Sequence, residues 1–482
     1  MSIIKNKKII NIITSGGQVF LVGVIYYFLY KFLLIELGVK LLGVWSVVMS
    51  ASSLANIADL GISTSMVRFV SLYEHNNNLK KIPNLVFTGV ILNMLFFIPI
   101  CLIIFPTAYF ILPNVIEKEY VSLARELLPF SLCCILINSI SGVYGSILDG
   151  FRKNYLRNFL LTISSVLFLI SSIFLVKKYG LIGVVWAQIF QSLFSLIGCL
   201  FISIKIIQYN PFKWNWSKSI FNEIIRYGIK FQLTSLTGVL NEPITKMLLS
   251  RFGGLAFTGY YEMANKLVMQ IRGAIVAGNQ SLMPYLVKEN VSEEKSKFSI
   301  LEISFAGVFV ISLFILSILN ISSNWISNIW ILHYEPIFIK VLLCVSISMF
   351  INLLSAPVYF ALLSYDKLRP IIVSQSAMVI TNLTLGFCFG YFFKGYGIVF
   401  SWMITVIVGS TILIASLKIN QTLGVLFKNK LYFASIFCIS LFFVSISYLL
   451  NYSFVLLNIL YISIFSVIVL FFIKKIKFET IN

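Results

Sequence analysis

The 482-residue sequence has few charged residues, and acids are the scarcer kind. Asp, Glu, Lys and Arg make up 11% of the chain against 59% hydrophobic residues, and the mean hydropathy is +0.95. Apolar runs of about 20 residues recur along the whole length, which is the length of helix that crosses a bilayer. This composition excludes a soluble enzyme. The runs also lack the short alternating pattern of a membrane β-barrel.

Histidine and cysteine are too sparse and too scattered for a metal or redox site. The chain has 2 histidines, and its 7 cysteines fall inside apolar runs without metal-ligand spacing. The adjacent Cys133 and Cys134 are interpreted as packing residues. We therefore expect no bound cofactor.

The apolar runs, separated by short polar breaks, predict an all-α polytopic membrane protein with about 14 transmembrane helices. None of the breaks is long enough for a separate extramembrane domain. The expected spans are 10–34, 42–70, 84–112, 121–148, 156–176, 180–206, 222–250, 256–286, 298–320, 337–363, 370–393, 396–417, 431–450 and 453–473.

The net charge of +20 indicates contact with a membrane surface rather than with nucleic acid. Segments on the side of the N-terminus hold more than twice as many Lys and Arg as the opposite loops. Under the positive-inside rule both termini are therefore cytoplasmic. Lys177 and Lys178, in an external loop, are an exception to this bias. The basic N-terminus and the apolar stretch after it are interpreted as a retained first span.

The second half of the chain resembles the first half. LGVKLLGVW from Leu37 aligns with GGLAFTGYY from Gly253. The aligned glycines are Gly38 with Gly254, Gly43 with Gly259, and Gly183 with Gly397. Six spans separate the copies, so both have the same topology, and such parallel repeats form two-lobed transporters. The expected parts are an N-terminal six-helix lobe at 1–210, a C-terminal six-helix lobe at 211–420 and two further helices at 421–482.

Charged and amide side chains interrupt the two predicted spans in the middle of the chain. They are Lys230, Asn241, Glu242 and Lys246 in the first, and Glu262, Asn265, Lys266, Arg272 and Gln280 in the second. A charge at the bilayer centre costs about 2.5–3.5 kcal/mol, so such residues normally indicate a binding site or water-filled path. Four cations against two acids leave a positive excess, which favours an anion such as phosphate. Glu242–Lys246 and Glu262–Lys266 could instead be structural pairs between packed helices.

A smaller polar set occurs in the span 42–70. Ser52, Asn56, Asp59 and Ser63 have the spacing of one helix face, which predicts a polar stripe. Arg68 lies on the opposite face near the cytoplasmic end, where extension to the lipid headgroups explains it equally well.

Two segments resemble the Wzx-type polysaccharide-repeat flippases of the MATE/MOP exporter superfamily. They are LGVKLLGVWSVVMSASSLANIADLGISTSMVRF from Leu37 and GGLAFTGYYEMANKL from Gly253. The resemblance implies transport of an undecaprenyl-diphosphate-linked oligosaccharide, an O-antigen or capsule repeat unit, across the bacterial cytoplasmic (inner) membrane. It also implies alternating access coupled to Na⁺ or H⁺. A polysaccharide polymerase and a chain-length regulator are the partners implied.

Each polar residue is assigned an expected role. The candidates for binding the anionic substrate are Lys246, Lys266, Arg272, Lys230 and Arg68. The candidates for ion coupling are Asp59, Glu242 and Glu262, and those lining the cavity are Asn56, Asn241, Asn265 and Gln280. Tyr144, Tyr260, Tyr261 and Tyr359 are candidates for stacking on sugars or for gating, and anchoring at the membrane interface explains tyrosines equally well. The chain departs from the family at Thr245–Lys246, where many relatives have an Asp-Arg pair, so Glu242 is the alternative acid.

Other functions remain open at this point. A multidrug or cation antiporter of the same fold would need an acidic or neutral cavity. A lipid II flippase would share the cationic cavity. A membrane glycosyltransferase, polymerase or ligase would need a large external loop or an acid cluster, and neither is present in the sequence.

Overall fold

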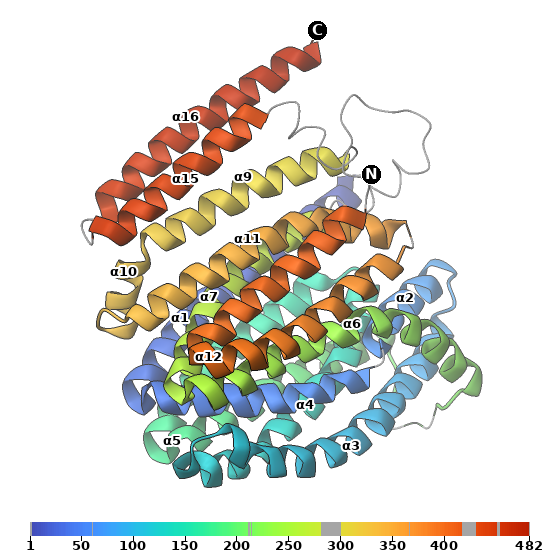
Figure 1. The fold of residues 1–482 in the computed structure, drawn as a ribbon. Coiled ribbons are helices and arrows are strands. Elements are labelled where there is room, and N and C mark those ends of the chain that lie inside the picture. Colours follow the sequence, from blue (N-terminus) through green and yellow to red (C-terminus); the bar gives the residue numbers. More distant parts are fainter. Residues whose placement is uncertain are drawn as a thin grey trace. The chain divides into compact units, whose positions relative to one another are not determined.

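The structure is a computed structural model, and its regular structure is helical throughout the described part of the chain (Figure 1). It describes residues 2–59, 61–210, 213, 215–280, 300–365, 367–416, 430–450 and 454–481. Within these ranges, 7 helices are long and apolar enough to cross a membrane. The predicted class, an all-α polytopic membrane protein, is confirmed.

The helices follow the predicted spans closely. In chain order they are α1 (Ser2–Ser53), η1 (Leu54–Asp59), α2 (Ile62–His75), η2 (Leu79–Lys81), α3 (Ile82–Val115), η3 (Lys118–Tyr120), α4 (Val121–Gly150), α5 (Asn154–Ile207), α6 (Lys218–Gly253), α7 (Leu255–Gln280), α9 (Ile300–Ile321), α10 (Ser323–Ile326), η4 (Ser327–Ile331), α11 (Pro336–Ser364), α12 (Arg369–Ser416), α15 (Lys430–Leu450) and α16 (Phe454–Ile481). Helices α1, α5 and α12 each join two helical stretches across one non-helical residue, which is Gly38, Gly180 and Lys394 respectively.

The backbone at these junctions confirms the internal repeat. Gly38 has φ 78° and ψ 166°, and its aligned residue Gly254, between α6 and α7, has φ 85° and ψ 170°. Gly180 has φ 56° and ψ −135°, and Lys394 has φ 52° and ψ −134°. Glycine adopts positive φ without a steric penalty, which explains three of the four positions.

The predicted span 42–70 is not one continuous helix. Leu54–Asp59 forms a 3-10 turn, and Gly61 then adopts the left-handed conformation with φ 69°. A Cβ at Gly61 would collide with the backbone of Gly228 in α6, so only glycine allows this close approach. The change from 3.6 to 3 residues per turn rotates the side chains that follow. The continuous helix assumed for the predicted polar stripe is therefore interrupted at Leu54–Asp59, although Asp59 and Ser63 of that stripe contact each other.

The chain forms two compact units. Unit 1 comprises Met1–Gly259 and Asn382–Ile398, and unit 2 comprises Tyr260–Thr381 and Val399–Asn482. The boundaries fall inside α7 and α12. The division into lobes at 1–210 and 211–420 stays a prediction.

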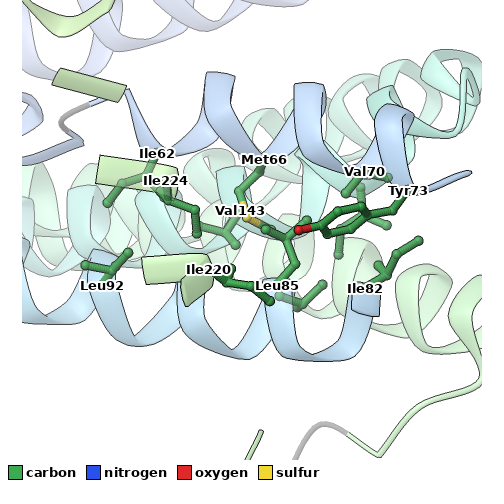
Figure 2. Packing of buried hydrophobic residues seen from close by; sticks show 12 residues of the cluster. Ile62, Met66, Val70, Tyr73, Ile82, Leu85, Leu92, Val143, Ile220 and Ile224 are labelled. Carbon is green, nitrogen blue, oxygen red and sulfur yellow. The ribbon is translucent and has the colours of Figure 1, made fainter. Parts of the chain in front are cut away.

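In unit 1, one hydrophobic cluster holds α2, α3, α4 and α6 together. Figure 2 shows Met66 of α2 beside Val143 of α4, and Val70 further along α2 beside Tyr73. The other labelled members are Ile62, Ile82, Leu85, Leu92, Ile220 and Ile224. The break at Gly61 separates α2 from α1, so the direction of α2 depends on its own packing. This cluster therefore fixes the orientation of the helix that carries Arg68.

In unit 2, α15 and α16 run beside α9 (Figure 1). Their interface is aromatic, with Phe314 of α9 against Phe465 of α16 at 4.8 Å between ring centroids. The buried Tyr461 hydroxyl is 2.9 Å from the Ser440 hydroxyl of α15. The two C-terminal helices are thus packed on α9 through large apolar side chains.

Candidate functional site

Helix α6 holds an ion pair with one buried member near its C-terminal end. The Lys246 Nζ is 2.6 Å from the Glu242 Oε1, one helical turn away. The Lys246 side chain is 5% exposed and that of Glu242 is 58% exposed. The predicted pair is confirmed, and the ammonium is the buried member while the carboxylate reaches the surface of the described chain.

A neutral network surrounds the backbone of α6 beside this pair. The Asn382 amide of α12 donates to the Asn241 carbonyl oxygen at 3.1 Å and to the Thr245 hydroxyl at 2.9 Å. All three residues are buried. Pro243 interrupts the same turn and supplies no N–H, so side chains rather than backbone satisfy part of this segment.

Asp59 and Asn56 lie on the 3-10 turn after α1. The Asp59 carboxylate accepts a hydrogen bond from the Ser63 hydroxyl at 3.1 Å, and Asn56 is exposed. Ser52 instead is buried, with its hydroxyl 2.5 Å from that of Ser131 in α4. The residues expected to form one stripe therefore face different surroundings.

Arg68 lies on α2 beside the first turns of α6. Its guanidinium is 4.2 Å from the centroid of the Tyr227 ring, and it is exposed. Between the same two helices, the Tyr73 hydroxyl of α2 is 3.3 Å from a carboxylate oxygen of Glu223 in α6. Burial and the Glu223 charge raise the pKa of Tyr73 to about 12, so this hydroxyl stays protonated and donates.

The start of α7 is closely packed. Glu262 is 8% exposed and Asn265 is 5% exposed, Lys266 is half-buried, and Gln280 at the end of the helix is exposed. The Glu262–Lys266 pairing stays a prediction. Tyr261 is 1% exposed and meets Trp402 edge to face at 6.0 Å, which is the contact of a packing residue.

Arg272 of α7 has a neutral partner. Its Nε donates to the Asn352 Oδ1 of α11 at 2.9 Å, and the Asn352 amide donates to the Ser410 hydroxyl of α12 at 3.2 Å. Tyr359 is close enough to interact with the guanidinium electrostatically. Over the described residues no carboxylate pairs with Arg272. Unit 2 therefore holds a half-buried guanidinium whose charge is not neutralised by a described acid.

The structure adds partners that the sequence spacing did not identify. Asn352 binds Arg272, Asn382 binds Asn241, and Ser410 accepts from Asn352. Each is an uncharged polar residue inside a predicted span. An amide inside a predicted span was a usable signal, because buried polar groups need hydrogen-bond partners. Lys230 lies on α6, and its side chain is outside the described residues.

The fold agrees with the comparisons to known proteins. The family model "Polysaccharide biosynthesis protein" matches residues 6–290. This is more than half of the chain, and the chain belongs to that family. No curated relative matches it by sequence.

Solved structures show the same fold. The lipid II flippase MurJ, in an inward closed conformation, is 18% identical with a TM-score of 0.69 over 93% of this chain and 97% of that one. An inward-facing multidrug resistance MATE family transporter of the MOP superfamily is 15% identical, with a TM-score of 0.67 over 82% and 93%. A MOP superfamily transporter from Pyrococcus furiosus is 14% identical, with a TM-score of 0.58 over 86% and 96%. The fold is that of the MOP superfamily, as the sequence resemblance predicted.

Proposed function

We propose that the protein is a flippase for an undecaprenyl-diphosphate-linked oligosaccharide, an O-antigen or capsule repeat unit. It would move this lipid across the bacterial cytoplasmic membrane by alternating access, with both termini in the cytoplasm. Two findings support the proposal: membership of a polysaccharide biosynthesis family, and a fold shared with a lipid II flippase. A polymerase and a chain-length regulator would then receive the product.

Arg272 is the observation that carries the proposal. Its hydrogen-bond partner is the amide oxygen of Asn352, so its positive charge is only partly compensated. Keeping a cation among apolar helices costs about 2.5–3.5 kcal/mol, and a phosphate oxygen would offset that cost while accepting from the free N–H groups. A cation exporter would gain nothing from a guanidinium, because it would repel the substrate. This charge favours an anionic substrate over a multidrug cation.

The buried Lys246 supports the same substrate in a different way. Its partner Glu242 is more than half exposed, so that carboxylate is accessible to protons, and loss of its charge would strengthen the attraction of the Lys246 ammonium for an anion. Glu242, and in the same manner Asp59 or Glu262, would thereby link proton or Na⁺ binding to the hold on diphosphate. Diphosphate binding and ion coupling then share one electrostatic mechanism.

The test is transbilayer movement in proteoliposomes. A polyprenyl-diphosphate oligosaccharide is placed in one leaflet, and its exposure to a membrane-impermeant glycosidase is followed with and without a Na⁺ or H⁺ gradient. The variants are Arg272→Gln and Lys246→Gln. The matched control is Arg125→Gln, because the Arg125 Nε likewise donates to a neutral oxygen, the Tyr109 carbonyl at 3.2 Å.

Wild type and Arg125→Gln should move the lipid at the same rate. Arg272→Gln and Lys246→Gln should lower the transport rate about tenfold or more, since each removes a charge-assisted hydrogen bond to phosphate. Equal rates in all four proteins would contradict the assigned residues. Vesicles carrying lipid II and vesicles carrying a cationic dye test the two alternative transporters. Movement of either one in place of the oligosaccharide lipid would replace the proposed substrate.

A further inference from the structure

A cavity of about 260 Å³ in unit 1 lies between α2 and the start of α6. Its walls carry two arginines, two aromatic rings and one acid, which are Arg68, Phe69, Glu223, Arg226 and Tyr227. The first two belong to α2 and the other three to α6. This volume accommodates a phosphate group with part of its substituent.

The interior surface of this cavity is almost wholly apolar, and the two guanidinium groups beside it are available to a ligand. Arg68 and Arg226 are exposed, and with the described residues neither forms an ion pair or donates a hydrogen bond. Arg68 is held in place by stacking over the Tyr227 ring at 4.2 Å. Stacking fixes the plane of a guanidinium and leaves its N–H edge directed outward, which is the arrangement that binds phosphate oxygens in pairs.

The single acid of the cavity is already occupied as a hydrogen-bond acceptor. One carboxylate oxygen of Glu223 is 3.3 Å from the Tyr73 hydroxyl, and the other is 3.4 Å from the Ser219 hydroxyl. The cavity therefore holds two cations and one acid that is engaged by neighbouring hydroxyls. Its net charge is positive, and the ring faces of Tyr227 and Phe69 add apolar contact area beside the charges.

This cavity is distant from the buried cation of the same helix. Arg226 and Lys246 are twenty residues apart on α6, which at 1.5 Å per residue is about 30 Å along the axis. One phosphate group cannot bind both. Arg68 and Arg226 must therefore contact a different phosphate, or the same phosphate at a different stage of transport.

We propose that the cavity of Arg68, Arg226 and Tyr227 binds the phosphate of a lipid headgroup in the cytoplasmic leaflet. The side of the membrane rests on the proposed function, because the lysine and arginine bias that places the termini also places this end of α2 and α6 in the cytoplasm. The phosphate could belong to the diphosphate of the lipid-linked substrate before transport or to an anionic phospholipid. Both present the same oxygens to the two guanidinium groups.

The experiment measures binding of two soluble probes to the detergent-solubilised full chain by equilibrium dialysis. Farnesyl diphosphate represents the lipid-linked substrate, and dioctanoyl phosphatidylglycerol represents the phospholipid. The variants are the double substitution Arg68→Ala with Arg226→Ala, and the single substitution Glu223→Gln. The control is Arg251→Ala, because Arg251 is also an exposed arginine of α6, 5.8 Å from the Phe252 ring and outside the cavity.

We expect the double variant to weaken at least one probe about tenfold or more, since two charge-assisted contacts are lost. Glu223→Gln should tighten the same probe, because it removes the acid of the cavity. Arg251→Ala should bind as wild type does. The probe that responds identifies the source of the phosphate. Unchanged binding of both probes in the double variant overturns the proposal, with thermal unfolding used to check that each variant is folded.

The flipping assay separates this proposal from the proposed function. If wild type transports the lipid and the double variant binds both probes normally, the cavity is not a phosphate site and the flippase function stands. If wild type transports nothing and probe binding still depends on the two arginines, the phosphate site stands and the transport function fails.

Discussion

The two sequence repeats share their backbone more closely than their residues. At the first junction both copies have glycine, Gly38 and Gly254, with nearly the same φ and ψ. At the second junction the torsions again agree, yet one copy has Gly180 and the other has Lys394. A lysine accepts positive φ only where the surrounding structure imposes it. The comparison shows that the fold imposes the backbone conformation at these turns, and that glycine only lowers the conformational strain of adopting it.

A second pair of glycines shows the same relation through contacts. A Cβ at Gly43 would collide with the Leu255 carbonyl, and a Cβ at Gly259 would collide with the Val39 carbonyl. Gly43 aligns with Gly259, and the two contacts are each other's counterpart in the repeat. Three residues after the second junction, Gly183 and Gly397 approach the Leu175 and Phe389 carbonyls, each within its own copy and at equivalent positions. Close approach of backbones is therefore a property of both copies.

The largest effect is expected from breaking the reciprocal contact. Gly43→Ala and Gly259→Ala should each destabilise the protein by about 3 kcal/mol, because the added methyl meets a backbone carbonyl that cannot rotate away. The double variant should cost less than the sum, since the first alanine already separates the two backbones. Thermal or denaturant unfolding in detergent measures all three.

Gly278 of α7 supplies the matched control, because a Cβ there meets no described residue within 4 Å. Gly278→Ala should be neutral or stabilising by up to about 1 kcal/mol, as expected for glycine inside a helix. A neutral Gly43→Ala, or full additivity in the double variant, would show that the reciprocal contact is absent.

Substitutions at the second junction, Gly180 and Lys394, should change stability in opposite directions. Lys394→Gly should stabilise the protein by about 1–3 kcal/mol, because it relieves a positive φ that lysine disfavours. Gly180→Ala should destabilise it by a similar amount, and the cost is purely conformational because a Cβ at Gly180 has nothing within 4 Å. Opposite shifts of the unfolding temperature are expected. Shifts of the same sign would mean that the two junctions do not share a backbone conformation.

The sequence predicted the positions of the helices well because hydropathy alone determines them. The expected span 84–112 is α3, Ile82–Val115, and 337–363 is α11, Pro336–Ser364. The break at Gly61 was not predictable, because it results from the approach of Gly228, a residue far along the chain. The partners of Arg272 come from two other helices for the same reason. Spacing within a helix says which residues share a face, and it does not say which helix lies opposite.

The smallest effect on stability is expected at the first junction, where Gly38 and Gly254 have different neighbours. Gly38 has no neighbour within 4 Å of a Cβ, whereas at Gly254 the Glu117 Oε1 would lie 3.4 Å away. Glu117 also accepts from the Leu255 N–H at 3.4 Å and pairs with the Lys40 ammonium at 3.1 Å. One carboxylate thus links the residues that follow both junctions, at the N-terminus of α7, where a negative charge is favourable.

Glu117→Gln should lower the unfolding temperature slightly, since both side chains of the ion pair are about half exposed. Glu119→Gln, two residues away, is the control, because Glu119 makes no hydrogen bond or ion pair with a described residue and attracts Lys40 more weakly than Glu117 does. The difference in unfolding temperature between wild type and Glu117→Gln should become smaller in high salt, because salt screens the attraction between Glu117 and Lys40. An unfolding-temperature difference that persists unchanged in salt would assign the contribution to the Leu255 hydrogen bond. Gly254 would then be held by the N-terminus of α7 rather than by the link of Glu117 to Lys40.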